Sequence, residues 1–268
     1  MRLFWLLFLL AWPVAAVVFL AMGPAMNWWF PTTKPPGQIG QDIDYLFYVI
    51  GGICAVIFLA TNVALGRAIW KGSAVPDGEK GLYVHGNHRL EVIWTVVPLL
   101  VLIFIAVYQT EAWASLKIQS QFPEPAVQPI AEVQARQFEW RIRYPGLDPA
   151  TGQPLPLTDE PKETDLWTVN ELHVPNGRPV MIRLKSQDIQ HSFYLPELRI
   201  KQDAVPGLNI PVWFQTSEPG EHVLMCAELC GWGHYKMSAR VIAEESEEDW
   251  LAYMRRLQAE ERDDGVEE

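Results

Sequence analysis

The 268-residue sequence is poor in cysteine and has no excess of basic charge. Its three cysteines are Cys54, in an apolar run, and the closely spaced pair Cys226 and Cys230, which are too few for a disulfide scaffold. The formal net charge of -11 has the wrong sign for binding phosphate backbones. We therefore expect neither a small disulfide-bonded domain nor a nucleic-acid-binding protein.

Charged side chains are also absent from three long stretches, residues 3–33, 45–66 and 92–110. A helix that crosses a bilayer needs about 20 consecutive apolar residues, so these stretches argue against a purely soluble protein. Negative charge is instead concentrated in residues 244–268, which hold eleven acids and three bases. The sequence thus predicts a membrane protein whose last segment, residues 244–268, is an acidic tail.

Residues 1–30 form the first apolar segment and allow two interpretations. A single basic residue, Arg2, precedes the apolar run, and small residues near position 23 resemble a cleavage region, as in a signal peptide. The run of about 20 apolar residues, followed by Trp28 and Trp29, also fits a retained transmembrane helix. Both interpretations place the residues that follow on the outer side of the membrane.

Residues 42–112 predict a transmembrane helical hairpin, with apolar cores at about 45–65 and 92–108. Pro98 is expected to kink the second of these helices rather than end it. The loop between them carries four basic residues, so the positive-inside rule makes this loop cytoplasmic. These residues are Arg67, Lys71, Lys80 and Arg89. Everything after residue 110 should then lie outside the cell.

Within residues 113–243 the sequence pattern changes to short runs of β-branched and aromatic residues, separated by turn signals such as Pro-Asn-Gly and Pro-Gly. Examples of these runs are 130–135, 138–144, 180–184, 211–215 and 222–225. Many short strands at regular spacing predict an all-β Greek-key sandwich or barrel. Residues from about 247 to 262 have helical spacing of apolar side chains and predict a closing amphipathic helix.

A short string late in the sequence gathers side chains that bind metals: Cys226, Glu228, Cys230, His234 and Met237. Another candidate ligand, His191, lies upstream beside a predicted strand. Thiolates and a thioether beside imidazoles favour copper, and they favour zinc less because methionine is a poor zinc ligand. Gly231 and Gly233 provide the loop flexibility that lets ligands on both sides of a turn face one centre.

Simpler interpretations compete with this one. The two late cysteines alone also fit a small disulfide or half of a zinc site. A membrane-tethered copper chaperone or a zinc-binding structural module would use the same residues, and metal content distinguishes them. We expect His173 and His222 to pack in the sheets, and Met181 and Met225 to lie in the core.

The metal-binding string resembles subunit II of the haem-copper cytochrome c oxidases. The resemblance rests on Cys226-x-Glu228-x-Cys230-Gly-x-x-His234-x-x-Met237, on His191-Ser192, and on Lys201-x-Asp203-x-x-Pro206-Gly207. It extends upstream through Glu91-x-Ile93-Trp94-Thr95-x-x-Pro98 and Gln137-Phe138-Glu139-Trp140, and covers about residues 42–243. What it implies is a membrane α-helical hairpin followed by an all-β cupredoxin-like Greek-key sandwich or barrel.

The resemblance also implies a dinuclear copper centre, CuA, with two copper ions. Cys226 and Cys230 would bridge both ions, and His191 and His234 would each bind one. Met237 would be a weak ligand, and the backbone carbonyl of Glu228 another. The Glu228 side chain would help to hold a magnesium ion shared with subunit I, in keeping with oxygen ligands for a hard cation.

By the same resemblance, the chain would accept electrons from cytochrome c and pass them to a haem in subunit I. There oxygen is reduced to water and protons are pumped; this chain would hold no oxygen-reducing residue. Phe138, where the family often has tryptophan, and Trp140 are the candidate electron ports. Glu91 matches a glutamate at the mouth of a proton-uptake path, although an acid at a helix N-terminus is also an ordinary favourable interaction.

The implied partners are subunits I and III, cytochrome c and membrane lipid, and the implied location is a bacterial plasma membrane with the copper domain on its outer, periplasmic face. A quinol-oxidising relative would lack the copper ligands that this sequence has. A nitrous-oxide-reducing enzyme would need a catalytic domain. No C-x-x-C-H motif occurs in these residues, so a fused cytochrome c domain is not expected.

Overall fold

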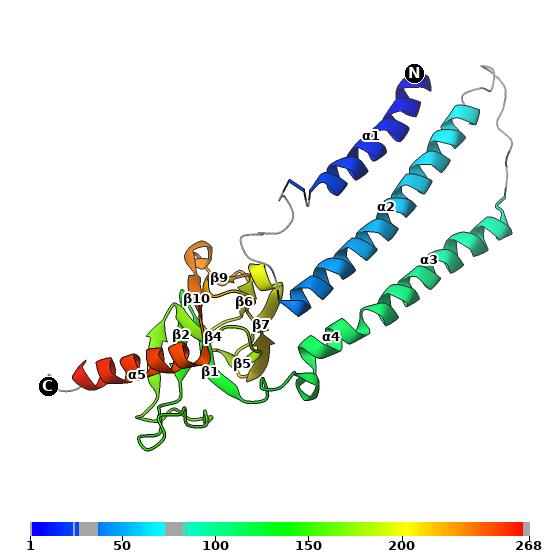
Figure 1. The fold of residues 1–268 in the computed structure, drawn as a ribbon. Coiled ribbons are helices and arrows are strands. Elements are labelled where there is room, and N and C mark those ends of the chain that lie inside the picture. Colours follow the sequence, from blue (N-terminus) through cyan, green and yellow to red (C-terminus); the bar gives the residue numbers. More distant parts are fainter. Residues whose placement is uncertain (1, 24, 27–36, 73–82, 84, 265–268) are drawn as a thin grey trace. The chain divides into compact units, whose positions relative to one another are not determined.

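A computed structural model describes residues 2–23, 25–26, 37–72, 83 and 85–264 of the chain (Figure 1). The chain divides into a helical unit, residues 1–30 and 44–111, and a β unit, residues 31–43 and 112–268. Trp28, Trp29 and Lys80, which entered the analysis of topology above, lie outside the described residues.

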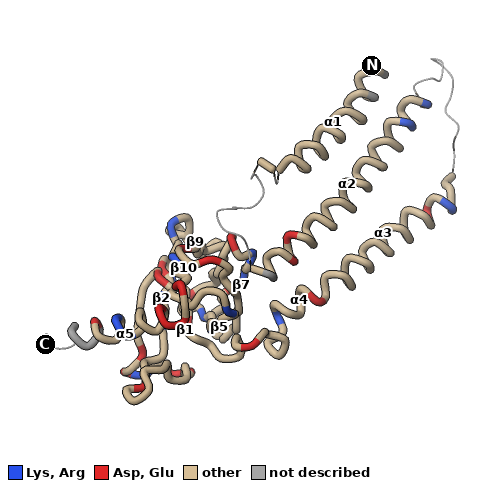
Figure 2. The backbone as a smooth tube through the Cα atoms, viewed as in Figure 1, with Lys and Arg blue, Asp and Glu red and all other residues tan. Residues whose placement is uncertain are grey.

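Three long apolar helices make up most of the helical unit: α1 (Arg2–Met22), α2 (Gln38–Gly72) and α3 (His88–Tyr108). Each is long and apolar enough to cross a membrane. The charged residues of α2 and α3 lie near the helix ends, and the middle of each helix carries none (Figure 2). Both interpretations of the first segment require a helix, and α1 is that helix. Whether it is a signal peptide or a membrane span stays a prediction.

The helices of the predicted hairpin extend beyond their apolar cores. The helix α2 runs well past residues 45–65 at both ends, because the flanking polar residues continue the helical hydrogen bonding. The helix α3 starts where the Asn87 side chain accepts hydrogen bonds from the backbone N–H groups of Arg89 and Leu90. Pro98 lies inside α3, as predicted.

Two five-stranded sheets form the β unit, which confirms the predicted all-β sandwich. One sheet has the order β3-β2-β1-β5-β8 and the other β4-β10-β9-β6-β7. The pairs β1–β5 and β4–β10 are parallel, and the remaining neighbours are antiparallel. The strands are β1 (Pro129–Arg136), β2 (Glu139–Tyr144), β3 (Leu166–Val169), β4 (Glu171–Pro175), β5 (Val180–Ser186), β6 (His191–Leu195), β7 (Ile200–Ala204), β8 (Ile210–Phe214), β9 (Gly220–Cys226) and β10 (Ser238–Glu244).

Short helices complete the β unit: α4 (Thr110–Lys117), η1 (Gln119–Gln121), η2 (Pro196–Leu198), η3 (His234–Lys236) and the longer α5 (Glu247–Asp264). The predicted amphipathic helix is therefore confirmed as α5. Its apolar face joins the sandwich core through Trp250, Leu251 and Met254, and the Trp250 indole N–H donates to the carbonyl of His173 at 3.1 Å. The acidic segment thus covers part of the sandwich as well as carrying charge.

Alternation along β9 decides which of its side chains reach the core. His222, Leu224 and Cys226 point inward, whereas Met225 is 45% exposed. The expectation that Met225 lies in the core is therefore wrong, because it sits one position out of phase with the buried face. Met181, His173 and His222 are buried in their strands, as expected.

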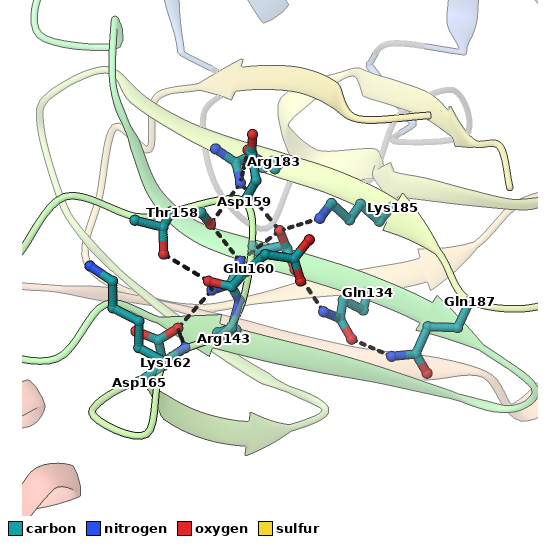
Figure 3. A network of polar contacts seen from close by, with 11 residues as sticks. Gln134, Arg143, Thr158, Asp159, Glu160, Lys162, Asp165, Arg183, Lys185 and Gln187 are labelled. Atoms are coloured by element: carbon teal, nitrogen blue, oxygen red, sulfur yellow. Dashed lines mark hydrogen bonds and ion pairs between the residues drawn. The ribbon is translucent and has the colours of Figure 1, made fainter. Parts of the chain in front are cut away.

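A buried charge network centres on Arg143 of β2 (Figure 3). Its guanidinium donates to Glu132 at 2.9 Å, to Asp165 at 2.6 Å and to the carbonyl of Thr158 at 2.8 Å. Lys185 adds a second cation 2.9 Å from the Glu132 carboxylate. Because Thr158 and Asp165 belong to the long segment between β2 and β3, the network fastens that segment to the sheet.

Candidate metal centre

The candidate ligands come from neighbouring strands and the loop that follows them. His191 is the first residue of β6, and Cys226 is the last residue of β9. The two strands are antiparallel neighbours, with Phe193 paired to Cys226. The chain then turns through Cys230 and η3 to Met237 before β10. Sheet register therefore brings together residues that are 35 positions apart in sequence.

The sulfur atoms of Cys226 and Cys230 lie 3.7 Å apart, and both cysteines are free thiols. His191 Nδ1 lies 3.9 Å from Cys226 Sγ, and His234 Nδ1 lies 3.6 Å from Cys230 Sγ. Met237 Sδ is 3.7 Å from Cys230 Sγ, and the Glu228 carbonyl oxygen is 3.3 Å from Cys226 Sγ. Every residue predicted to bind copper therefore has a donor atom in one cluster.

These separations suit a shared metal better than direct bonds between the side chains. Ligand bonds of about 2.0–2.3 Å at tetrahedral angles place donor atoms roughly 3.3–3.8 Å apart. The spacings of 3.6 and 3.7 Å fall in that range, and 3.9 Å is just beyond it. His191, Cys226, Cys230 and Met237 are at most 7% exposed, whereas His234 and Glu228 are partly buried. Thiolates, imidazoles and a thioether together are the donor set that copper prefers.

Backbone hydrogen bonds hold the ligand loop in place. The N–H of Cys226 donates to the Met237 carbonyl at 3.0 Å, and the N–H of Ala227 donates to the Ser192 carbonyl at 3.0 Å. The Gln137 side-chain amide donates to the Cys230 carbonyl at 2.6 Å. Both ends of the loop and its middle are thus fixed without help from a metal.

Asp188 is a supporting residue that the motif analysis did not assign to the site. Its carboxylate lies 2.8 Å from His191 Nε2 and accepts a hydrogen bond from the N–H of Gln137 at 2.8 Å. A carboxylate on the far nitrogen of a ligand imidazole fixes its orientation and leaves Nδ1 for the metal. The position of an acid three residues before a ligand histidine was the available clue.

The pKa values of the two thiols are shifted in opposite directions. Burial raises the pKa of Cys226, but hydrogen bonds to His191 and to the backbone of Glu228 outweigh burial and lower this pKa to about 6. Burial and the neighbouring Cys226 raise the pKa of Cys230 to about 12. Cys226 is therefore the thiol that ionises first, and metal binding must displace the proton of Cys230.

The pKa of the His191 imidazole, which lies beside Cys226, is shifted upward. Burial lowers the pKa of His191, but its contacts with Cys226 and Asp188 outweigh burial and raise it. Partial burial raises the pKa of Asp188, and its hydrogen bonds with Gln137 and His191 lower it overall. Both shifts favour a charge pair between the His191 imidazole and the Asp188 carboxylate.

The two candidate electron ports lie at different depths. Trp140 is fully buried and contacts His191, with ring centroids 6.5 Å apart. Phe138, just before β2, is partly buried beneath Trp232, with centroids 5.2 Å apart. Trp232 itself is 76% exposed and lies in the ligand loop. Trp232 is not among the site residues predicted from the sequence, although it lies between Cys230 and His234.

Two other predicted residues have clear local settings. The Glu228 side chain is partly buried in the ligand loop. Glu91 lies in the first turn of α3 with a half-exposed carboxylate 3.7 Å from His88 Nδ1, a position that also suits the helix dipole. Glu91 belongs to the helical unit and the predicted copper ligands to the β unit.

Comparison with known proteins identifies two family segments. The family model described as "Cytochrome C oxidase subunit II, periplasmic domain" matches residues 153–244. The model described as "Cytochrome C oxidase subunit II, transmembrane domain" matches residues 32–111. The first match includes all six predicted copper ligands, and the second includes Glu91.

Several curated proteins are similar over most of the chain. The alternative cytochrome c oxidase subunit 2 of Bradyrhizobium diazoefficiens is 31% identical, over 92% of this chain and 90% of that protein. Cytochrome c oxidase subunit 2 of Cereibacter sphaeroides is 27% identical, over 84% of this chain and 79% of that protein. A solved periplasmic domain of subunit II from Bradyrhizobium japonicum is 20% identical with a TM-score of 0.40, over 48% of this chain and 93% of that domain.

Proposed function

Because the chain belongs to the cytochrome c oxidase subunit II family, we propose that its β unit holds a dinuclear copper centre that relays electrons from cytochrome c. The family is the copper-binding subunit of the oxidase, and the chain is a membrane protein with a periplasmic, cupredoxin-like domain. The proposed relay passes each electron to a haem in subunit I, where oxygen is reduced to water and protons are pumped.

The arrangement of the thiols supports two coppers rather than one. The two sulfur atoms form the middle of the cluster, with the His191 imidazole against Cys226 and the His234 imidazole against Cys230. Two ions that share both thiolates would each have one imidazole, with Met237 and the Glu228 carbonyl as weak additional ligands. This symmetrical order of donors is the observation that carries the proposal.

Copper bound here would supply a one-electron redox couple whose charge is shared between two ions. The protein's part is to hold the donors rigidly and to exclude water. The backbone hydrogen bonds of the ligand loop hold the donors. The burial of His191, Cys226, Cys230 and Met237 keeps water from these four side chains. Asp188 orients His191, so the ligand geometry changes little when the charge of the centre changes.

Other assignments complete the proposal. Glu228 would place its carboxylate on a magnesium ion at the boundary with subunit I. Glu91 would stand at the mouth of a proton-uptake path, and subunit III and membrane lipid would be further neighbours. We also propose the division into residues 1–30, 42–112, 113–243 and 244–268, and a bacterial plasma membrane as the location.

Electron paramagnetic resonance with metal quantitation tests this function on the purified full chain in detergent after copper loading. We expect two coppers per chain and a seven-line pattern from one electron shared between two nuclei. The Cys230→Ser variant should lose this pattern, because it removes one bridging thiolate. A four-line spectrum with one copper would favour a copper chaperone, and bound zinc with no copper would favour a structural module.

A further inference from the structure

Trp232 is an exposed aromatic residue that lies inside the metal-binding loop. It follows Cys230 by two positions and precedes His234 by two, and it is 76% exposed. Single exposed apolar residues are ordinary on protein surfaces, so exposure alone assigns no role. The contacts beneath and above this ring are what distinguish it.

The loop presses Trp232 onto Phe138. The two rings meet edge to face, with centroids 5.2 Å apart and planes at 65°. The flanking glycines permit this approach: a Cβ on Gly233 would lie 2.5 Å from Phe138 ring carbons, and one on Gly231 would lie 2.8 Å from the Gln137 amide. The ammonium of Lys236 lies 4.8 Å from the centroid of the Trp232 ring. The ring is therefore held in a defined place although most of its surface faces solvent.

The other aromatic candidates are less accessible. Trp140 has no exposed surface, so a donor protein cannot touch it without unfolding the sheet. Phe138 is partly buried and has Trp232 against it. Trp232 alone among these three rings combines high exposure with a covalent path to two ligands, Cys230 and His234.

We propose that Trp232 is the residue that contacts the electron donor and admits the electron to the copper centre. This proposal rests on the function proposed above. The donor's ferrous haem would lose one electron and become ferric, and the copper pair would gain that electron, with no bond formed and no proton moved. The partner surface that fits is the apolar rim around an exposed haem edge, because a rigid tryptophan is the side chain that most often dominates such contacts.

Variants of the assembled oxidase test the assignment, with soluble cytochrome c as the probe. Trp232→Leu should raise the KM for reduced cytochrome c by about 10- to 100-fold, the range expected when an interface tryptophan is lost. Its affinity for oxidised cytochrome c, measured by calorimetry without turnover, should fall by the same factor. Trp232→Phe should restore most of the affinity because it keeps an aromatic ring.

Tyr235→Leu is the matched control, because Tyr235 is 82% exposed in the same region. We expect this control to change the affinity less than threefold. Reduction by hexaammineruthenium, a small donor that needs no docking surface, should be unchanged in both leucine variants, as should copper content. Equal losses in Trp232→Leu and Tyr235→Leu, or a loss confined to Phe138→Leu, would overturn the assignment. A wild-type complex that hexaammineruthenium does not reduce would instead overturn the proposed function.

Discussion

At the scale of single residues, the sandwich contains a charge cluster that is unrelated to the copper ligands. The side chains of Arg143 and Glu132 are no more than 1% exposed, and each has a further partner of opposite charge, Asp165 or Lys185. Removing charges from water is costly, so such a group is stable only while its partners remain. The cluster therefore makes the fold sensitive to any change that leaves one charge unpaired.

Glu132→Gln should lower the free energy of unfolding of the β unit by about 3 kcal/mol, because it removes the carboxylate shared by Arg143 and Lys185 and leaves the buried guanidinium with Asp165 alone. Thermal and urea unfolding of the full chain in detergent, followed by near-ultraviolet circular dichroism, measures this change. Glu221→Gln is the control, since Glu221 and its partner Arg240 are mostly exposed and such pairs contribute about 0–1 kcal/mol. Equal effects of the two variants would contradict the role given to the buried cluster.

The ion pair between Glu132 and Arg143 also predicts that the stability of the fold depends on pH. Burial raises the pKa of Glu132, but hydrogen bonds from Arg143, Gln134 and Lys185 outweigh burial and lower it. A carboxylate with a lowered pKa in the folded state stabilises the protein above its unfolded pKa of about 4.3, and this stability is lost as the pH falls through the folded value. The stability difference between wild type and Glu132→Gln should therefore shrink below about pH 4 and be constant near neutrality.

At the scale of elements, the loop from β9 to β10 fits closely against the residues that precede β2. Gly231 and Gly233 both lie close to this segment, and each position requires glycine for a different reason. Gly233 has an ordinary backbone conformation, and the nearest atoms to the place of its missing side chain belong to the Phe138 ring. Gly231 has a φ of +124°, which L-residues rarely adopt, as well as a close neighbour in Gln137.

Gly233→Ala should displace the ligand loop and reduce copper occupancy, and Phe138→Ala in the same chain should restore it by removing the clashing ring. Gly231→Ala should reduce occupancy in either background, because its backbone strain persists without Phe138. Copper content and the copper spectrum of the wild type, the three single variants and the two double variants measure these two double-mutant cycles. Additive effects of Gly233→Ala and Phe138→Ala would show that the ring is not what requires glycine at position 233.

The sequence was sufficient to predict the type and approximate place of most elements. The long apolar runs, the alternating strands and the spacing of Trp250 and Met254 each have a periodicity that only one kind of structure satisfies. The cluster of donor side chains was predictable because five of its members lie within one short string. Asp188 and the contact between Phe138 and Trp232 were not, because they depend on how β6 and the segment before β2 approach the loop, which no local pattern encodes.

At the scale of the whole molecule, the order of charged and apolar segments determines on which side of the membrane each polar segment lies. Four basic residues, Arg67, Lys71, Lys80 and Arg89, lie between the apolar cores of α2 and α3, and the strands of the β unit follow α3. Lys and Arg in short loops are retained on the cytoplasmic side, so the loop and the β unit should lie on opposite sides. This arrangement would place the copper centre where a periplasmic electron donor reaches it and Glu91 where cytoplasmic protons do.

Cysteine labelling in intact cells tests this orientation with a maleimide that does not cross the plasma membrane. Tyr83→Cys reports on the loop and Ser217→Cys on the β unit, each in a chain whose three native cysteines are replaced by serine; both positions are exposed. We expect Ser217→Cys to react in intact cells and Tyr83→Cys to react only after lysis. Because this background cannot bind copper through thiolates, the test addresses topology separately from metal binding. Reaction of Tyr83→Cys in intact cells would contradict the orientation and, with it, the proposed place of Glu91 at the mouth of a proton-uptake path.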